Sequence, residues 1–406
     1  MNVVHERCCG LDVHKATVVA CRLTPGRKEV RTFPTTTRGL LALADWLAEA
    51  GITDVAMEST GVYWKPVFNV LELTDLEIMV VNAQHIKAVP GRKTDVKYAE
   101  WIADLLKHGL LKASFIPDRG HRELRELVRY RKSLTQERNN LVNRIQKLLE
   151  GANVKLGDVV TDVMGKSGRA MLRAMVAGKT DSVELANLAK GSLRGKRAIL
   201  EEALEGSVGA HQRYLLEHQL DLVDFLDRQI EELSVEIEER MRPFEPAIQQ
   251  VMRLPGIGRR SAVQILAEIG VDMSRFPSHR HISSWAKVCP GNNESAGRSR
   301  SGWTGKGNPW LRAALVEAAW GAARSHKSYF AVQYNRLKIR RGTKRAAVAV
   351  AHRLLIVIYH LLRDGTIFQD LGAAFLDERQ QQSVVRHSVK RLERLGYRVT
   401  LTPAAA

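Results

Sequence analysis

The first 111 residues alternate between strand-like and helix-like patterns in a fixed order, and this order limits the possible folds more than any other feature of the sequence. Three apolar or alternating segments, separated by short polar or Pro/Gly breaks, predict three strands in meander order. Short apolar strands then alternate with segments of helical spacing. The predicted strands are 9–13, 16–23, 29–33, 54–57 and 78–81, and the predicted helices are 37–50, 63–73 and 95–111. The predicted order is therefore βββαβαβα.

Two acidic residues lie at the ends of predicted strands. Asp12 is close to the end of the first strand, and Glu58 ends the fourth. A meander followed by α/β crossovers is the element order of the ribonuclease H-like fold, in which acidic residues at strand ends gather at one edge of the sheet. Carboxylates on rigid neighbouring strands suit two divalent metal ions held ~4 Å apart. We therefore predict a metal site for phosphoryl chemistry at these two residues.

The middle of the chain is predicted to be mostly helical. Within 121–150, apolar residues recur at helical spacing, with eight Lys or Arg and four Glu on the other faces. Residues 216–237 place apolar side chains at nearly heptad spacing and form a coiled-coil candidate. This seam fits a helix pair within one chain as well as a coil between two chains. Residues 165–206 predict short helices broken by glycines.

A glycine-containing turn opens the C-terminal part. Residues 254–258 read Leu-Pro-Gly-Ile-Gly and precede a helical segment, 262–269, which matches a helix-hairpin-helix. In such a motif Gly256 and Gly258 let the turn run close to a phosphate, and the next helix offers its free N–H groups. The alternative is a plain corner between two helices of a bundle.

A second candidate for phosphate contact follows. Turn-forming residues fill the segment from Pro290 to Pro309, and a helix begins at Trp310. Residues 298–345 contain 12 Lys or Arg and a single acid, Glu317. This imbalance beside a glycine-rich loop favours phosphate contact over a merely solvated face. After Phe375 the sequence predicts a polar helical tail.

The whole chain is strongly basic. Its 406 residues include 62 Lys or Arg against 44 Asp or Glu, which gives a net charge of +18 and a pI near 9.9. This excess favours a polyanionic partner, nucleic acid above all. The four cysteines include no C-x-x-C pair, which favours reduced thiols over a zinc site. Since no signal segment or run of ~18–20 apolar residues is evident, we expect a cytoplasmic location and no membrane partner.

Several motifs together carry a family resemblance. They are Gly10-Leu-Asp-Val-His-Lys15, Met57-Glu-Ser-Thr-Gly61, Lys93-Thr-Asp95, Leu254-Pro-Gly-Ile-Gly258 and the segment from Pro290 to Gly297. In this order they resemble the DEDD transposases of the insertion-sequence-110 family, over roughly residues 8–155 and 245–345. The resemblance implies a ribonuclease H-like domain similar to Holliday-junction resolvases, followed by a helical domain that supplies a nucleophilic serine.

The resemblance also implies which residues act. Asp12, Glu58 and Asp95 match the first three acidic positions and would hold Mg²⁺, with Mn²⁺ as an alternative, and Ser295 matches the serine. The fourth acid of the family lies three residues after the third, where this chain has Tyr98. A phenol near its reference pKa of about 10 is neutral and a poor magnesium ligand. Glu100 and Asp104 are nearby, but neither is one helical turn from Asp95.

Further residues are expected to contact nucleic acid. The side chains of Arg298 and Arg300 could stabilise the charge on a reacting phosphate, and Lys306 lies in the same basic segment. His14 and Lys15 are expected to orient backbone or phosphate. The resemblance implies DNA as substrate and a structured noncoding RNA, encoded by the element, as guide. Because the acids and Ser295 are about 200 residues apart, a composite site in a dimer or tetramer is expected.

The sequence thus predicts a transposase that cuts and rejoins DNA in a bacterial cytoplasm, associated with the nucleoid. The predicted domains are a catalytic domain at 1–115, a basic helix and coiled-coil region at 116–244, a helical transposase domain at 245–345, and C-terminal helices at 346–406. Two alternatives remain. One is a decayed transposase that only binds nucleic acid, which Tyr98 favours; the other is a metal-only nuclease for branched DNA. A covalent protein–DNA adduct through serine distinguishes the three.

Overall fold

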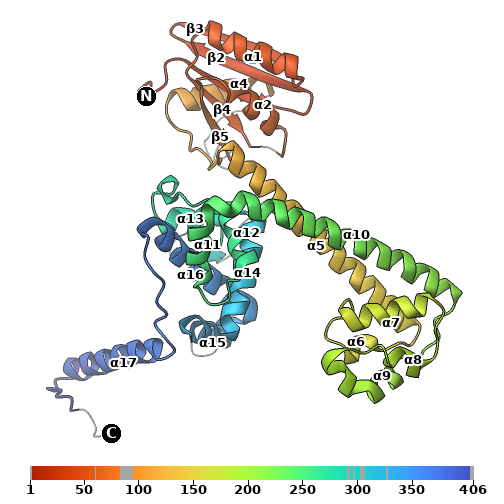
Figure 1. Cartoon of the computed structure of the whole chain (residues 1–406). Coiled ribbons are helices and arrows are strands. Elements are labelled where there is room, and N and C mark those ends of the chain that lie inside the picture. The colour runs from red at the N-terminus through yellow and green to blue at the C-terminus, as the bar shows by residue number, and fades with distance from the viewer. Residues whose placement is uncertain are drawn as a thin grey trace. The chain divides into compact units, whose positions relative to one another are not determined.

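The chain forms two compact units, Met1–Pro117 and Asp118–Ala406. A computed structural model of the protein, drawn in Figure 1, describes residues 2–59, 61–82, 95–289, 293–295, 298–301, 307–325 and 328–402. The first unit ends two residues beyond the predicted boundary at 115. The boundaries predicted at 244 and 345 stay predictions, and residue 345 lies inside a long helix.

A five-stranded sheet forms the centre of the first unit. Its strands are β1 (Cys8–Val13), β2 (Thr17–Thr24), β3 (Arg27–Pro34), β4 (Asp54–Glu58) and β5 (Glu77–Val81), in the spatial order β3-β2-β1-β4-β5. The first three strands are antiparallel, whereas β4 runs parallel to both β1 and β5. The meander and the crossovers predicted from the sequence are therefore confirmed.

Helices cover both faces of this sheet (Figure 1). Because side chains alternate along a strand, Leu11 and Met57 pack into a core on one face with Leu43 of helix α1 (Thr37–Glu49) and Val67 of helix α2 (Trp64–Leu71). On the other face, the apolar side chains pack against helix α4 (Asp95–Lys107). Asp12 and Glu58 have the strand parity of this second face.

Gly10 allows α4 to lie directly on β1. A Cβ atom on Gly10 would lie only 2.3 Å from the backbone nitrogen of Ala103 and 2.3 Å from the carbonyl oxygen of Ala99. The glycine, together with the two small alanines, therefore lets the helix backbone touch the strand. This close approach fixes α4 over the strand that carries Asp12.

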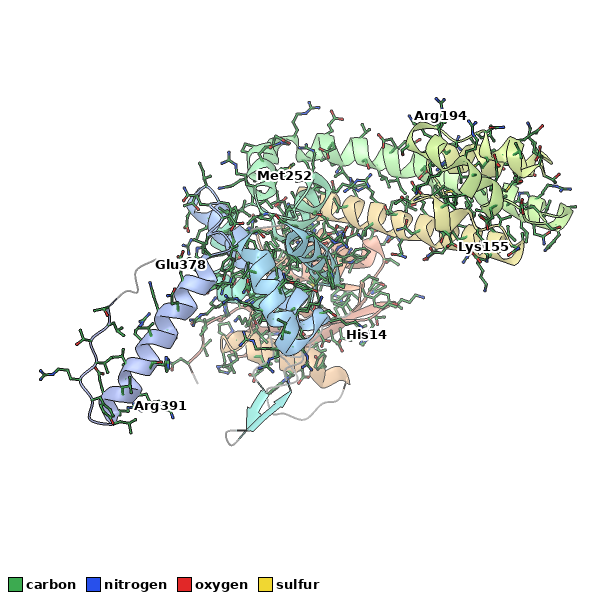
Figure 2. The ribbon with its side chains drawn as sticks, turned by 90° about the horizontal axis from the view of Figure 1, so that it is seen from below. His14, Lys155, Arg194, Met252, Glu378 and Arg391 are labelled. Carbon is green, nitrogen blue, oxygen red and sulfur yellow. The ribbon has the colours of Figure 1, made fainter. Side chains whose placement is uncertain are left out.

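A pair of long helices begins the second unit. Helix α5 (Arg119–Gly151) and helix α10 (Ala210–Met241) pack side by side, with Leu141 and Ile145 of α5 in one core with Leu216 and Val223 of α10. The heptad seam at 216–237 thus packs within the chain. Short helices at one end of the pair complete this core, in the region where Figure 2 labels Lys155 and Arg194. These are α6 (Leu156–Val159), α7 (Lys166–Val176), α8 (Ser182–Ala186), the 3₁₀ helix Gly191–Lys196 and α9 (Arg197–Ala203).

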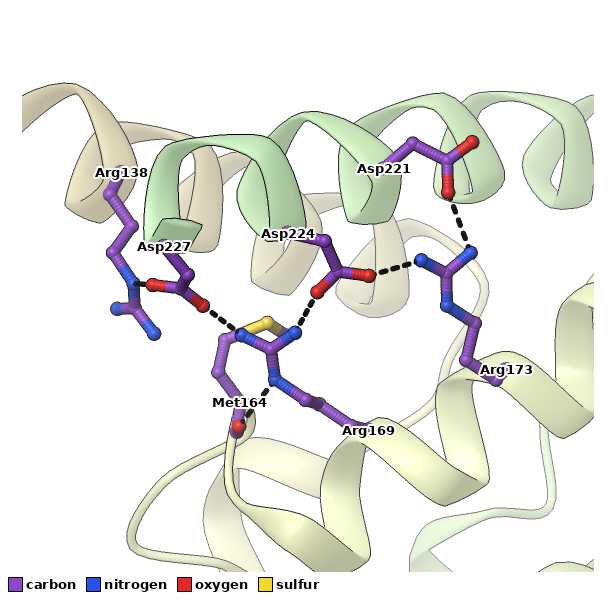
Figure 3. A network of polar contacts seen from close by, with 7 residues as sticks. All are labelled: Arg138, Met164, Arg169, Arg173, Asp221, Asp224 and Asp227. Atoms are coloured by element: carbon purple, nitrogen blue, oxygen red, sulfur yellow. Dashed lines mark hydrogen bonds and ion pairs between the residues drawn. The ribbon is translucent and has the colours of Figure 1, made fainter. Parts of the chain in front are cut away.

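Ion pairs between arginines of α7 and aspartates of α10 join α7 to the pair of long helices. Arg169 bonds to Asp224 and Asp227 of α10, and Arg173 bonds to Asp221 and Asp224 (Figure 3). The aspartates recur every three residues and therefore share one side of α10. Arg138 of α5 also bonds to Asp227, so one network joins three helices.

A helical bundle completes the second unit. Its helices are α11 (Glu245–Met252), α12 (Arg259–Ile269), α13 (His279–Ala286), α14 (Pro309–Arg324), α15 (Tyr329–Arg341) and α16 (Thr343–Asp364), with 3₁₀ turns at Arg242–Phe244 and Met273–Arg275 and the polar helix α17 (Phe375–Arg394) after it. In the described part of the chain, α16 alone is long and apolar enough to cross a membrane. It packs against α11, α13, α14 and α15, so it serves as the core helix of the bundle.

Candidate active site

Two acidic side chains lie next to each other at the carboxyl ends of parallel strands. The register pairs Gly10 with Ala56 and Leu11 with Met57, so the residues that follow, Asp12 and Glu58, are neighbours across β1 and β4. Asp12 is only 9% exposed. Both carboxylates therefore sit at one edge of the sheet, as the sequence predicts.

Tyr98 of α4 lies over this pair. Its hydroxyl donates a hydrogen bond to a carboxylate oxygen of Glu58. Burial raises the pKa of the Tyr98 phenol well above its usual range, and the hydrogen bond to Glu58 and the negative charges of Glu58 and Asp12 raise it further. The phenol is therefore neutral, and position 98, where the family resemblance predicts an acid, carries a hydrogen-bond donor to Glu58.

His14 lies beside Asp12 at the same edge. Its Nε2 atom is 3.2 Å from Oδ2 of Asp12, while about half of the histidine side chain is exposed. The backbone N–H of His14 donates to the carbonyl of Thr17, which holds the histidine in the turn between β1 and β2. Asp12 is thus oriented by a neighbouring ring that also faces solvent.

The third predicted acid begins helix α4. Asp95 is one helical turn before Tyr98, but its side chain lies outside the described residues. Within the described side chains, no three His, Cys, Asp or Glu residues gather closely enough to hold a metal ion. The two carboxylates of Asp12 and Glu58 are hard oxygen donors of the kind that Mg²⁺ prefers, and Asp95 would provide a third. The donor types therefore fit magnesium.

The two other acids of α4 have partners elsewhere. Oε2 of Glu100 is 2.9 Å from Nζ of Lys28 at the start of β3, and Asp104 is 3.6 Å from the ring of His108. Neither carboxylate joins the pair at Asp12 and Glu58. Tyr98 therefore has no acidic substitute on this helix within the described part of the chain.

Ser295 lies on a small hairpin in the second unit. It ends strand β6 (Asn293–Ser295), which pairs antiparallel with β7 (Arg298–Ser301), so that Ser295 is opposite Arg298. Arg300 lies on the same strand as Arg298. The side chains of these three residues and the whole of Lys306 lie outside the described residues, so their predicted roles stay predictions.

The glycine turn at 254–258 connects α11 to α12. Gly256 has a φ of +80°, and a Cβ there would lie 2.1 Å from the backbone nitrogen of Ala322 and 2.4 Å from the carbonyl of Ala318 on α14. This glycine is therefore required for contact with another helix. Gly258, at the start of α12, has open space around it, and its phosphate contact stays a prediction.

The basic side chains of α5 and those at the junction of α15 and α16 differ in whether they make ion pairs. Of the nine Lys and Arg of α5, four make ion pairs with acids of other helices, namely Glu268, Glu317 or Asp227. Residues 338–345, which we call the α15–α16 corner, carry five exposed cations that make no ion pair with any described residue: Lys338, Arg340, Arg341, Lys344 and Arg345. The α15–α16 corner is therefore a cluster of five exposed cations within eight residues that described acids do not neutralise.

Sequence reasoning missed one buried acid, Glu268. It is 0% exposed and binds Arg129 of α5 through two hydrogen bonds of 2.7 and 2.8 Å. The available signal was a glutamate within the apolar helical run 262–269, where periodicity assigns a buried position.

Comparison of the sequence with known protein families identifies the family of this chain. Residues 9–154 match the "Transposase" family of IS110 DEDD transposases, and residues 248–335 match the "Transposase IS116/IS110/IS902 family". The first match contains the strand-end acids and α4, and the second contains the glycine turn and the Ser295 hairpin.

Two curated proteins are similar to the chain over most of its length. The chain is 26% identical over 276 residues to "Putative transposase y4rJ" of Sinorhizobium fredii, an alignment that covers 63% of this chain and 61% of that protein. It is 22% identical over 377 residues to "Pilin gene-inverting protein" of Moraxella lacunata, covering 88% of this chain and 96% of the relative. With both family models matched in order along the sequence, the chain belongs to the IS110 family of transposases.

Proposed function

We propose that this protein is a DNA recombinase with a ribonuclease H-like domain, which cuts and rejoins DNA strands to mobilise an insertion sequence. The observation that carries the proposal is the adjacent pair Asp12 and Glu58 at the ends of parallel strands, in a chain that matches the family over both functional segments. Paired carboxylates at such an edge are typical of phosphoryl transfer.

Each residue has a chemical role in the proposed reaction. Asp12, Glu58 and Asp95 would hold Mg²⁺, or Mn²⁺, which neutralises charge on a DNA phosphate. The Ser295 hydroxyl oxygen bonds to phosphorus while the bond from phosphorus to a deoxyribose oxygen breaks, and that oxygen takes up the proton. Arg298 and Arg300 stabilise the negative charge on the phosphate. Attack by the deoxyribose hydroxyl of another strand reverses the step, releases the serine and joins DNA.

The proposed partners are DNA, a structured guide RNA encoded by the element, and further copies of this chain in a dimer or tetramer. Base pairing would read the sequence while the protein holds backbones. The net charge of +18 and the unneutralised α15–α16 corner support polyanion binding. The open turn at Gly258 supports a helix-hairpin-helix-like phosphate contact.

Trapping of a covalent adduct tests this proposal. With labelled element-end DNA and Mg²⁺, we expect an adduct that resists denaturant, is absent in Ser295→Ala, and is lost in Asp12→Ala and Glu58→Ala. Ser295→Ala should keep DNA binding, since one hydroxyl contributes little to an interface of many phosphates. Strand nicking without an adduct would replace this proposal with the metal-only nuclease.

A second candidate function is favoured by Tyr98. If the protein binds DNA but neither nicks it nor forms an adduct at any Mg²⁺ or Mn²⁺ concentration, it is a decayed, non-catalytic homologue. The hydrogen bond that Tyr98 donates to Glu58 engages one of the carboxylates that the metal would need.

A further inference from the structure

Glu268 is a buried carboxylate at the meeting point of three segments of the second unit. It lies on α12, and Arg129 of α5 binds both of its oxygens, 2.7 Å from Oε1 and 2.8 Å from Oε2. Arg125, one turn earlier on α5, donates to the backbone carbonyl of Glu268 at 2.7 Å. The charge of the carboxylate is thus neutralised from α5, the helix that continues the chain after Pro117.

The same carboxylate also holds the segment that carries Ser295. Nδ2 of Asn308 donates to Oε2 of Glu268 at 2.6 Å. Oδ1 of Asn308 caps helix α14 by accepting from the N–H groups of Trp310 and Leu311, at 3.0 and 3.1 Å. Both ends of the Asn308 amide are therefore fixed, one to the buried acid and one to the helix.

A close backbone contact brings the two ends of this segment together. A Cβ on Gly307 would lie 2.5 Å from Cβ of Lys287 and 2.6 Å from the carbonyl of Ala286. Lys287 ends α13 in the left-handed conformation, with φ 51°, which turns the chain out of the helix. The end of α13 at Lys287 therefore lies against Gly307, next to Asn308, and strands β6 and β7 come between these residues in the sequence.

We propose that Glu268 is a positioning residue for the Ser295 hairpin, and that it acts through Asn308. It fixes the point where the hairpin rejoins the bundle and ties that point to the first turns of α5. The expected effect of Glu268 on catalysis rests on the proposed function, in which Ser295 is the nucleophile. The anchoring itself is independent of that role.

Two conservative variants test the anchor. Glu268→Ala would leave Arg125 and Arg129 without their partner and is expected to unfold the unit, so Glu268→Gln and Asn308→Ser are used. Serine retains the helix cap but lacks the Nδ2 donor, so Asn308→Ser removes only the link to Glu268. Glu317→Gln is the matched control, because Glu317 joins α14 to Lys132 of α5 at 3.1 Å from an exposed position.

The first measurement is hydrogen–deuterium exchange of backbone N–H groups in the full-length protein. We expect exchange in peptides covering 287–310 to be about tenfold faster or more in Glu268→Gln and Asn308→Ser, with α12 and the control unchanged. Exchange at 287–310 that matches wild type in both variants would overturn the proposal. Faster exchange throughout the second unit in both variants would also overturn it, because Glu268 would then be a general folding residue.

The second measurement separates positioning from binding. If the wild-type protein forms the Ser295 adduct, both variants should bind DNA within about twofold of wild type but form the adduct about 10–100-fold more slowly. Small misplacements of a nucleophile have effects of this size. Equal adduct rates in folded variants would refute the positioning role. If wild type forms no serine adduct, the proposed function fails, whereas the exchange comparison still decides whether Glu268 anchors the hairpin.

Discussion

Burial, together with the hydrogen bond to Glu58, raises the pKa of Tyr98 and keeps its phenol protonated. A phenol that donates to one carboxylate and lies near another keeps its proton, because ionisation would place a third negative charge beside Asp12 and Glu58. The sequence showed that position 98 carries a tyrosine. It could not show that α4 places the hydroxyl on Glu58, since this depends on packing between residues 40 positions apart.

Tyr98→Phe tests this protonation state. Tyr98 should remain protonated at about pH 10–11, where exposed tyrosines ionise, so the variant and wild type should show the same tyrosinate absorbance there. As pH rises past about 10, the unfolded state releases the Tyr98 proton and the folded state retains it, so wild-type stability should fall relative to Tyr98→Phe. A lower tyrosinate absorbance in Tyr98→Phe than in wild type at this pH would contradict the assignment.

Tyr98→Asp should strengthen metal binding at the same site. An aspartate there lies one turn from Asp95 and supplies a charged oxygen ligand where the phenol supplies only a donor to Glu58. We expect the Mn²⁺ dissociation constant, measured by electron paramagnetic resonance, to fall about tenfold or more, and DNA cleavage to need less Mg²⁺. Tyr98→Asn is the control, because it removes the phenol without adding a charge. Equal effects of both variants would show that loss of the phenol, rather than the new carboxylate, is responsible.

Among the elements, the contact of α4 with β1 decides where the acids lie. The alternation of side chains along the strands made both the strands and the parity of Asp12 and Glu58 predictable. Gly10 was recognised in the sequence as part of a motif. The sequence could not show that a side chain at this position would collide with the backbone of Ala99 and Ala103, because that contact depends on where α4 packs.

Gly10→Ala should disrupt this contact. The added Cβ meets backbone atoms, which cannot move aside as the end of a flexible side chain can, so we expect a loss of about 3 kcal/mol in the free energy of unfolding of the first unit. Urea titration followed by tryptophan fluorescence, to which Trp46, Trp64 and Trp101 of the first unit contribute, reports it. Gly151→Ala, at a position with open space, should be neutral or slightly stabilising. Stability equal to wild type in Gly10→Ala would show that α4 can move away from the strand at little cost.

Other elements show why sequence patterns identify a surface more readily than its partner. The heptad seam at 216–237 correctly predicted a buried stripe, yet the spacing is the same whether the stripe meets α5 or a second chain. Gly256 was correctly placed in a turn, but its neighbours Ala318 and Ala322 come from a helix more than 60 positions away. Glu268 was missed for the same reason, because its partners lie on α5 and just before α14.

Across the whole molecule, the net charge of +18 does not reveal which cations are available. In the sequence the basic excess is spread over the helix at 121–150 and the segment 298–345. In the structure, four of the α5 cations neutralise acids of α10, α12 and α14, whereas the five at the α15–α16 corner make no ion pair with described residues. Phosphate binding should therefore depend more on the corner than on the paired cations.

The salt dependence of DNA binding tests this distinction. A protein that neutralises six to ten phosphates loses about 10³- to 10⁵-fold in affinity between 50 and 200 mM salt. Replacing Arg340 and Arg341 by Gln should lower the slope of log Kd against log salt by about 2, because each phosphate contact contributes close to one unit. The control removes the same charge from two exposed lysines that already pair with glutamates, Lys132→Gln with Lys155→Gln. Fluorescence anisotropy of labelled duplex gives both slopes. If the control lowers the slope as much as the corner variant, net charge rather than the corner governs binding. If neither variant changes the slope, other residues hold the phosphates. In that case Arg298, Arg300 and Lys306, in and beside the Ser295 hairpin, are the next residues to replace by Gln.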